Sequence, residues 1–171
     1  MRVFYDGDAD LNLIRAKRVG VIGYGAQGHA HALNLRDSGV DVIVALHADS
    51  RSLGRARDAA FDVVSVSDAA RDCDVLMVCA PDEAQPALYR NEIAPHMRAG
   101  KTLLFAHGFA MHFSFIEPPD EVDVAMVAPK GPGTALRDAF SRGGGLPAIV
   151  AVANDASGGA MRLALSYGAA I

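Results

Sequence analysis

Two polar residues, a histidine and a lysine, stand where buried strands are expected to end. His107 follows the apolar run Leu103–Phe105, and Lys130 follows a second run that ends at Val127. An imidazole titrates near pH ~6.5, so His107 could transfer protons at neutral pH. The ammonium of Lys130 could hold a carboxylate or a phosphate. A structural histidine and an exposed loop lysine are the alternative interpretations of these two residues.

A glycine-rich turn near the N-terminus is the clearest candidate binding site. Residues 19–28 read VGVIGYGAQG, an apolar strand that runs into GxGxxG and then into a helix. In this motif the first glycine permits a tight turn, the second lets a pyrophosphate approach the backbone, and the third lets helix and strand pack closely. Because strand, glycines and helix occur in this order, Gly23, Gly25 and Gly28 predict dinucleotide binding. A purely structural glycine-rich turn is the alternative.

The loop after the second expected strand should select between NADP and NAD. Residues 44–52 read VALHADSRS, without an acidic residue at the end of the strand where an NAD site places one for the ribose hydroxyls. The side chains of His47, Ser50, Arg51 and Ser52 can hydrogen-bond a 2′-phosphate, which favours NADPH over NADH. Asp49 argues against this preference, since its carboxylate would repel the phosphate. A solvated loop is the alternative interpretation.

A further loop follows the fourth expected strand and opens a helix. Its residues Asp82, Glu83, Ala84 and Gln85 could contact the cofactor through their N–H groups, although a simple helix N-terminus explains them equally well. The loop acids show no spacing that requires a metal ion, so no metal site is predicted from these residues.

Short apolar runs alternate with Ala-rich segments, a pattern typical of alternating strands and helices in an α/β fold. Because most runs are continuous Val/Ile/Leu stretches, we expect a mainly parallel sheet with helices on both faces, as in a Rossmann-like doubly wound fold. Segments 107–121 and 128–147 are expected as long loops. The strands are expected at 18–22, 42–45, 63–66, 75–79, 102–105, 122–127 and 148–152, and the helices at 27–37, 53–59, 84–93 and from 158 to the end, with a short turn at 68–71.

The 171 residues suit one domain, 1–171, with 51% hydrophobic residues and a formal net charge of −4. The absence of a Lys/Arg cluster argues against a nucleic-acid or anionic-membrane surface. No apolar run approaches the ~20 residues of a membrane span, and the acidic N-terminus is unlike a signal peptide, so a cytoplasmic location is expected. Cys73 and Cys79 lack CxxC spacing and are expected to be reduced structural thiols.

Taken together, the motifs resemble the ketol-acid reductoisomerases, NADPH- and magnesium-dependent enzymes of valine and isoleucine biosynthesis. The resemblance implies that His107 is the catalytic histidine, with Lys130 beside it. His47 and Asp49 depart from the family, which commonly has Arg or Lys at the first position and Gly at the second. The matching segments are 4–6 (FYD), 8–11 (DADL), 22–32 (IGYGAQGHAHA), 80–83 (APDE), 105–109 (FAHGF), 126–133 (MVAPKGPG) and 154–158 (NDASG). The residues implied to line the NADPH site are Tyr24, Gly25, Ala26, Gln27, Ser50, Ser52, Asp82, Glu83, Ala84, Gln85 and Gly133.

The resemblance extends over essentially all 171 residues but only over the N-terminal half of a family member. It implies that the magnesium ligands, and most contacts to the substrates 2-acetolactate and 2-aceto-2-hydroxybutyrate, lie in a C-terminal knotted helical domain. The chain is therefore expected to be incomplete for catalysis alone and to associate with such a domain or with itself. The alternatives are a stand-alone NADPH-dependent keto acid or imine reductase and a non-catalytic NADPH-binding module.

Overall fold

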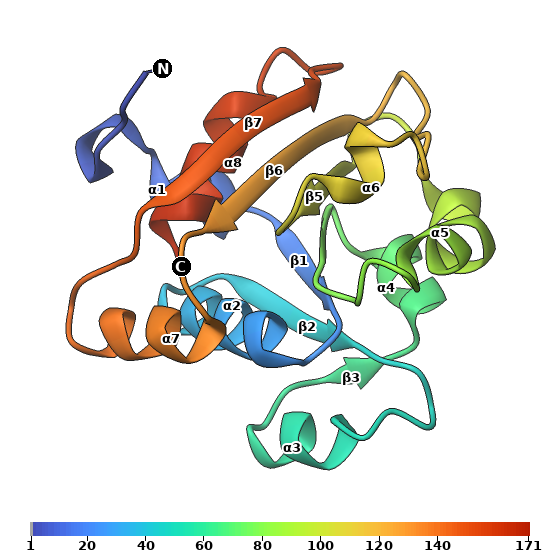
Figure 1. Ribbon diagram of the computed structural model, residues 1–171, viewed down its shortest axis with the longest axis horizontal. Helices are drawn as coiled ribbons and strands as arrows, with labels where there is room; N and C mark the ends of the chain where they lie inside the picture. Colours follow the sequence, from blue (N-terminus) through green and yellow to red (C-terminus); the bar gives the residue numbers. More distant parts are fainter. Residues whose placement is uncertain (1) are drawn as a thin grey trace.

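The computed structural model describes residues 2–171, which form a sheet of seven strands in the order β3-β2-β1-β4-β5-β6-β7 (Figure 1). Strands β1 to β6 are parallel, and β7 pairs antiparallel with β6. The mainly parallel α/β sheet expected from the sequence is therefore confirmed. The strands are β1 (Arg18–Ile22), β2 (Asp41–Ala45), β3 (Val63–Val64), β4 (Val75–Val78), β5 (Thr102–Phe105), β6 (Asp123–Pro129) and β7 (Ala148–Asn154).

Alternate residues of the central strands supply two apolar cores, one on each face of the sheet. Val21 belongs to the first core and Ile22 to the second, as expected for side chains that point to opposite faces. Strands β4 and β5 are buried over their whole length. This burial on both faces explains why their sequences are continuous apolar runs.

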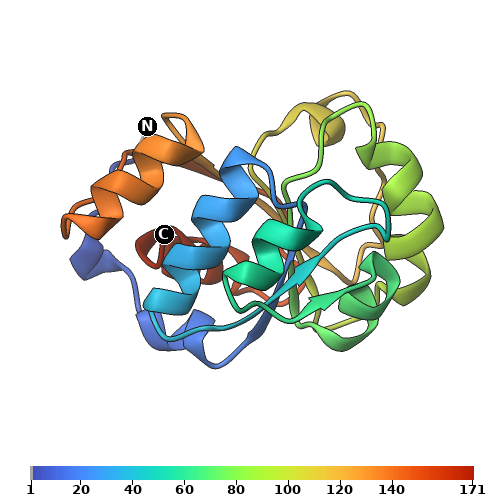
Figure 2. The same ribbon diagram turned by 90° about the horizontal axis from the view of Figure 1, so that it is seen from below.

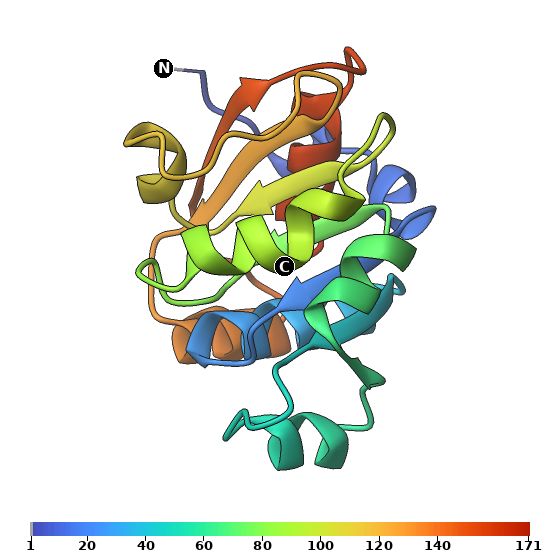
Figure 3. The same cartoon turned by 90° about the vertical axis from the view of Figure 1, so that its right-hand side faces the viewer.

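Helices cover the two faces unequally. The first core is covered by α1 (Leu11–Arg15), α2 (Ala26–Asp37), α3 (Leu53–Asp58), α7 (Gly133–Ser141) and α8 (Ala160–Ala169). Figure 2 shows α2 and α7 packed side by side on this face. The second core is covered by α4 (Val66–Asp72), α5 (Gln85–Leu88), which continues as η2 (Tyr89–Ile93) and η3 (Ala94–His96), and by α6 (Phe109–His112). In Figure 3, α4 and the α5–η2 helix stand in front of the sheet, and α8 lies behind it. A further short turn, η1, spans Asp6–Asp8.

Three local predictions were wrong. The third strand ends at Val64, because the Ser65 side chain accepts a hydrogen bond from the Asp68 N–H and starts α4 at Val66. The expected turn at 68–71 is thus part of a full helix. Segment 128–147 contains the nine-residue helix α7, whose Leu136 is buried and whose Arg137 reaches Asp37 at 2.6 Å.

The outer strand β7 is covered on one face only. Val150 and Val152 pack against the first core, whereas Ile149 is 47% exposed on the other face. Helices on both faces, as expected, therefore hold for the centre of the sheet but not for this strand. Within residues 2–171, no helix is long and apolar enough to cross a membrane.

Candidate functional site

The register of the strands brings the loops that follow the parallel strands to one edge of the sheet. Val19 is level with Val42 of β2 and with Val75 of β4, and the pairing continues in step across β5 and β6. The loops that follow β1, β4, β5 and β6 therefore meet at the carboxyl ends of the parallel strands, called the carboxyl edge below. In open α/β sheets this edge is where ligands bind.

The glycine turn between β1 and α2 has the geometry of a phosphate site. Gly23 has φ of +95°, and a Cβ at Gly28 would lie 2.0 Å from the Gly23 carbonyl oxygen, so neither position tolerates a side chain. A Cβ at Gly25 would meet nothing within 4 Å, which leaves open space over the backbone. Because α2 begins at Ala26, its first N–H groups face this space without intrahelical acceptors.

Tyr24 lies in the turn, but its side chain does not face this open space. The ring is 1% exposed and packs edge-to-face against His29 and Phe61, with centroid distances of 5.3 and 5.8 Å. The Tyr24 carbonyl accepts a hydrogen bond from Arg55 of α3, whose guanidinium also lies over the tyrosine ring. Burial raises the pKa of Tyr24. Tyr24 can thus serve a ligand only through its backbone, and Arg55, which the sequence reading missed, anchors the turn.

The loop after β2 places its polar side chains at the same edge. Ser50 donates its backbone N–H to the His47 carbonyl, and Ser52 N–H lies 3.3 Å from the Ser50 hydroxyl, which closes a tight turn. Asp49 and Arg51 are exposed on this turn. The His47 ring lies 3.6 Å from Glu92 of η2, an unforeseen contact that draws it toward the second face of the sheet. Ser50, Arg51 and Ser52 are the other side chains of this loop that can donate hydrogen bonds.

A cleft of about 300 Å³ lies between the loops after β4, β5 and β6. It brings together five of the residues expected from the sequence, which come from four separate segments of the chain. These residues are Gln27, Asp82, Gln85, His107 and Lys130. Glu83 and Ala84 are exposed beside the cleft and do not line it, and the loop residues 47–52 stand apart from it.

His107 has two competing partners at one ring nitrogen. Its Nδ1 lies 3.3 Å from the Phe109 backbone N–H and 3.7 Å from a carboxylate oxygen of Asp82. In a neutral ring, Nδ1 accepts from Phe109 and the proton resides on Nε2. In a charged ring, Nδ1–H points toward Asp82. With the Nδ1–H of the charged ring directed at Asp82, the proton on Nε2 is the one that can pass to a bound molecule, which leaves a neutral ring protonated at Nδ1.

Asp82 is itself positioned by a buried glutamine. The Gln85 side chain is 4% exposed and donates from Nε2 to the Ala80 carbonyl at 2.8 Å and to Asp82 at 3.1 Å. Among residues 2–171, the buried amide oxygens of Gln85 and Gln27 have no hydrogen-bond partner. The Gln27 Nε2 donates to the Gly131 carbonyl at 2.9 Å. Two unpaired acceptors in one cleft fit a ligand with amide N–H donors, such as the carboxamide of a nicotinamide ring.

Gly133 contributes to the site by close packing. A Cβ at this position would lie 1.9 Å from the Ala26 carbonyl oxygen and 2.9 Å from the Gln27 nitrogen. The start of α7 therefore rests directly on the start of α2. This contact, together with the Gln27 hydrogen bond, fixes the lysine loop above the glycine turn.

An exposed group of aromatic rings, called the aromatic patch below, follows His107 in the sequence. It consists of Phe109, Phe113 and Phe115, which are 38%, 55% and 52% exposed. Their ring centroids lie 4.9 to 6.1 Å apart, and Phe109 lies 6.4 Å from His107. Exposed apolar clusters of this kind mark contact surfaces more often than isolated side chains do.

Metal and thiol chemistry have little support in this region. Among residues 2–171, no three His, Cys, Asp or Glu side chains are grouped closely enough to hold a metal ion. Cys73 and Cys79 are unpaired, and burial raises their pKa values to about 11 and about 12. Both thiols stay protonated at neutral pH, as expected for structural cysteines.

Known proteins are similar to this chain in sequence and in fold. Residues 13–171 match the profile of a family described as the NADPH-binding domain of acetohydroxy acid isomeroreductase. The chain is also similar to an NADH-preferring ketol-acid reductoisomerase from an uncultured archaeon, with 43% identity and a TM-score of 0.95. This match covers 99% of the chain and 53% of the archaeal protein, so the chain spans about half the length of that relative.

More distant structures share the fold alone. A pyrroline carboxylate reductase from Plasmodium falciparum, solved with NADP bound, is 14% identical, with a TM-score of 0.66 over 92% of this chain and 56% of that one. A putative F420-dependent NADP reductase from Arthrobacter sp. FB24 is 19% identical, with a TM-score of 0.66 over 90% of this chain and 81% of that one. The Rossmann-like architecture expected from the sequence is thus confirmed.

Proposed function

Because the chain belongs to the acetohydroxy acid isomeroreductase family, whose nicotinamide-dinucleotide-binding domain it forms, we propose that the carboxyl-edge cleft is its redox site. The observation that carries this proposal is the convergence of Gln27, Asp82, Gln85, His107 and Lys130 on one cleft beside the glycine turn. The turn would bind the pyrophosphate, and the cleft would hold the nicotinamide end. The family's other name is ketol-acid reductoisomerase, in accord with the resemblance noted from the sequence.

The residues of the site fit such a cofactor at both ends. At the pyrophosphate, the open space over Gly25 and the first N–H groups of α2 would accept two phosphates. At the nicotinamide, the unpaired amide oxygens of Gln27 and Gln85 would accept its carboxamide N–H groups. Bound there, the cofactor supplies a hydride; the protein supplies the orientation and the proton.

We propose that NADPH is preferred over NADH. Ser50, Arg51 and Ser52 offer two hydroxyls and a guanidinium to a 2′-phosphate, whereas His47 is turned toward Glu92. The name of the family's domain specifies NADPH, but the archaeal relative prefers NADH. Replacing Ser50 by Asp should lower the NADPH/NADH affinity ratio about tenfold, because a second carboxylate would face the phosphate. An unchanged ratio, measured by fluorescence titration, would move the phosphate pocket elsewhere.

Two side chains would act on the substrate. His107 would donate a proton from Nε2 to the oxygen of the carbonyl being reduced, with Asp82 holding the charged ring. Lys130, exposed at the rim of the cleft, would bind the substrate carboxylate. Water reaches His107 in this chain, since its side chain is 69% exposed. A further surface that covers the cleft would exclude that water and strengthen both interactions.

The full family reaction, an isomerisation and reduction of 2-acetolactate or 2-aceto-2-hydroxybutyrate, is proposed to need groups beyond those described. Polarisation of the substrate oxygens calls for a Lewis acid such as Mg²⁺. Residues 2–171 hold no cluster of three ligands for one. We propose that a second domain supplies the carboxylates and that it contacts the aromatic patch at Phe109, Phe113 and Phe115.

The test is NADPH oxidation by this chain with either 2-acetolactate or the already rearranged 3-hydroxy-3-methyl-2-oxobutanoate, each with and without Mg²⁺. We expect no turnover in any of the four assays, in a sample shown to bind NADPH. Turnover of acetolactate with Mg²⁺ would contradict the need for a second domain. Turnover of only the rearranged keto acid would instead identify a stand-alone reductase. A sample that binds no dinucleotide would contradict the proposed redox site itself.

A further inference from the structure

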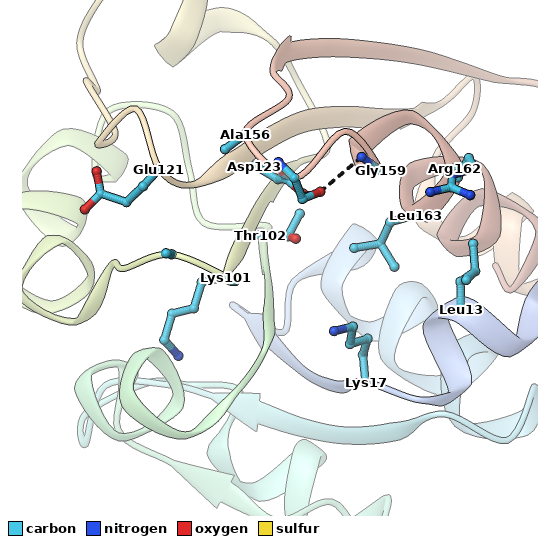
Figure 4. A pocket seen from close by; sticks show the side chains of 13 residues that line it. Leu13, Lys17, Lys101, Thr102, Glu121, Asp123, Ala156, Gly159, Arg162 and Leu163 are labelled. Carbon is cyan, nitrogen blue, oxygen red and sulfur yellow. Dashed lines mark hydrogen bonds between the residues drawn. The ribbon is translucent and has the colours of Figure 1, made fainter.

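A second cavity lies at the opposite edge of the sheet, where the parallel strands begin (Figure 4). Its volume is about 510 Å³, larger than that of the carboxyl-edge cleft. It is bounded by the starts of β5 and β6, by α1 and by α8. This cavity, called the amino-edge pocket below, plays no part in the proposed redox chemistry.

Two of the charged side chains at the amino-edge pocket are already satisfied by the protein. Asp123 is 6% exposed and accepts hydrogen bonds from the Ser157 N–H at 2.9 Å and from the Ser157 hydroxyl at 2.6 Å. Lys101 is 6% exposed, and its ammonium donates to the carbonyls of Arg71 and Cys73. These hydrogen bonds to neutral groups hold both side chains in place. The two side chains carry opposite charges, so together they add no net charge to the pocket.

The two remaining cations of the pocket have no such partners. Within residues 2–171, neither the Lys17 ammonium nor the Arg162 guanidinium takes part in a hydrogen bond or an ion pair through its side chain. In Figure 4 both stand on the α1–α8 side of the pocket with Leu13 and Leu163, whereas Glu121 lies on the opposite side. Two like charges that share a concave surface favour an anion between them.

The N–H groups at the N-terminus of α8 add little to the attraction of Lys17 and Arg162 for an anion. The Gly159 N–H donates to the Ser157 hydroxyl at 3.1 Å, and the Ala160 N–H donates to Asp155 at 2.8 Å. The first donors of the helix are thus already used. Attraction for an anion therefore comes from Lys17 and Arg162. The apolar side chains of Leu13 and Leu163 favour an anion that carries an aliphatic group.

We propose that the amino-edge pocket binds a small aliphatic carboxylic acid. The carboxylate would lie between Lys17 and Arg162, where the guanidinium can take it through two parallel N–H donors. The aliphatic part would contact Leu13 and Leu163. The acid should therefore bind more tightly than an anion that has no apolar group. This site is independent of the cofactor cleft and of the proposed redox function.

The test is a titration of the ¹⁵N-labelled chain, followed by amide NMR shifts, with butyrate, butyramide and inorganic phosphate as probes. We expect butyrate to shift the amides of Lys17 and of Gly159–Leu163 to saturation and to leave those of Gln27 and His107 in place. Butyramide, which has the same shape without the charge, should bind about tenfold more weakly or not at all. Phosphate should bind more weakly than butyrate.

A double variant, K17Q/R162Q, should lower the butyrate affinity about tenfold or more, whereas R142Q should not change it. Arg142 is the matched control because it is an exposed arginine, paired with Asp138 on α7 and absent from the pocket. The proposal would be overturned by no saturation with butyrate, by equal binding of butyrate and butyramide, or by binding that survives K17Q/R162Q. Tighter binding of phosphate than of butyrate would also overturn it, since the site would then select bare anions.

Discussion

The two edges of the sheet differ in how their polar groups are used. At the carboxyl edge, Gln27 and Gln85 each leave a buried amide oxygen without a partner, and the first N–H groups of α2 face open space. At the amino edge, Asp123 and Lys101 are buried and hydrogen-bonded to Ser157 and to backbone carbonyls. An unpaired buried polar group costs stability unless a ligand satisfies it. The carboxyl edge is therefore organised for a large polar ligand, and the buried charges of the amino edge are organised for stability.

The same contrast holds for the backbone. At the carboxyl edge, three glycines allow main-chain atoms to approach one another or a ligand, at Gly23, Gly28 and Gly133. At the amino edge, β1 begins with Arg18, which forms an ion pair with Asp41, and β6 begins with Asp123, which accepts hydrogen bonds from Ser157. Variants at the carboxyl edge should consequently change NADPH binding, whereas variants of the buried charges at the amino edge should change stability and leave NADPH binding unchanged.

The largest effect is expected for Gly133→Ala. The new Cβ would meet the Ala26 carbonyl at 1.9 Å and push α7 away from α2, which should lower the free energy of unfolding by about 3 kcal/mol. It should also weaken NADPH binding, because the lysine loop would move from the cleft. Urea unfolding and fluorescence titration measure the two effects. Gly145→Ala is the control, since a Cβ there meets nothing within 4 Å. Equal stability of the two variants would contradict the packing argument.

An effect of about the same size is expected in the core between the edges. His31 is fully buried, its Nδ1 lies 2.8 Å from the Tyr167 hydroxyl, and burial lowers its pKa to about 4. Between pH ~6.5 and about 4 the unfolded chain binds a proton that the folded chain does not, so stability should fall as the pH falls through this range. The His31 contribution should amount to about 3 kcal/mol at pH 4.

Chemical unfolding at several pH values measures this loss. His31→Gln should remove the His31 part of the slope, whereas the exposed-site variant His107→Ala should keep it. A profile that is the same for the wild-type chain and His31→Gln would show that another group carries the acid sensitivity.

The third prediction tests the amino edge. Asp123→Ala removes the acceptor of both Ser157 donors and should lower the free energy of unfolding by about 2 kcal/mol. NADPH affinity at the opposite edge should stay the same, as measured by fluorescence titration under conditions where the variant is folded. A large loss of NADPH affinity would mean that the two edges are coupled. It would contradict the claim that the buried charges of the amino edge serve stability alone.

The smallest effect is expected for His107→Ala at the carboxyl edge. The ring is largely exposed, and its contacts with Asp82 and Phe109 are long, so NADPH affinity should change by less than about twofold. Reduction of a keto acid by a form of the protein competent for turnover should nevertheless be lost. A large loss of affinity, found by the same titration, would place His107 in the cofactor pocket rather than at the substrate.

The central strands could be predicted from the sequence because a strand buried on both faces needs a continuous run of apolar residues. The apolar runs at β1, β4 and β5 match the expected bounds within a residue. Helix α7 was not predicted because it begins within the turn-like sequence Gly131-Pro132-Gly133. It is stabilised by Arg137, which reaches Asp37 and Asn34, about a hundred residues away in sequence. The antiparallel direction of β7 is likewise a property of chain topology rather than of composition.

The candidate site likewise contains residues that could be predicted from the sequence and residues that could not. His107, Lys130 and Asp82 could be foreseen because each follows a strand, and strand ends of a parallel sheet meet at one edge. Arg55 and Glu92 could not, because their partners, the Tyr24 carbonyl and His47, are set by how α3 and η2 pack. The buried ring of Tyr24 and the packing role of Gly133 also depend on the folded arrangement.

The most direct test of the account is to map NADPH binding on the ¹⁵N-labelled chain by amide NMR. We predict saturable shifts at Gly25–Gly28, Asp82, His107 and Lys130, all at the carboxyl edge, and none at Lys17 or Gly159–Leu163. Shifts centred on the amino-edge pocket, or no saturable shift at the glycine turn, would contradict the claim that the carboxyl-edge cleft is the redox site.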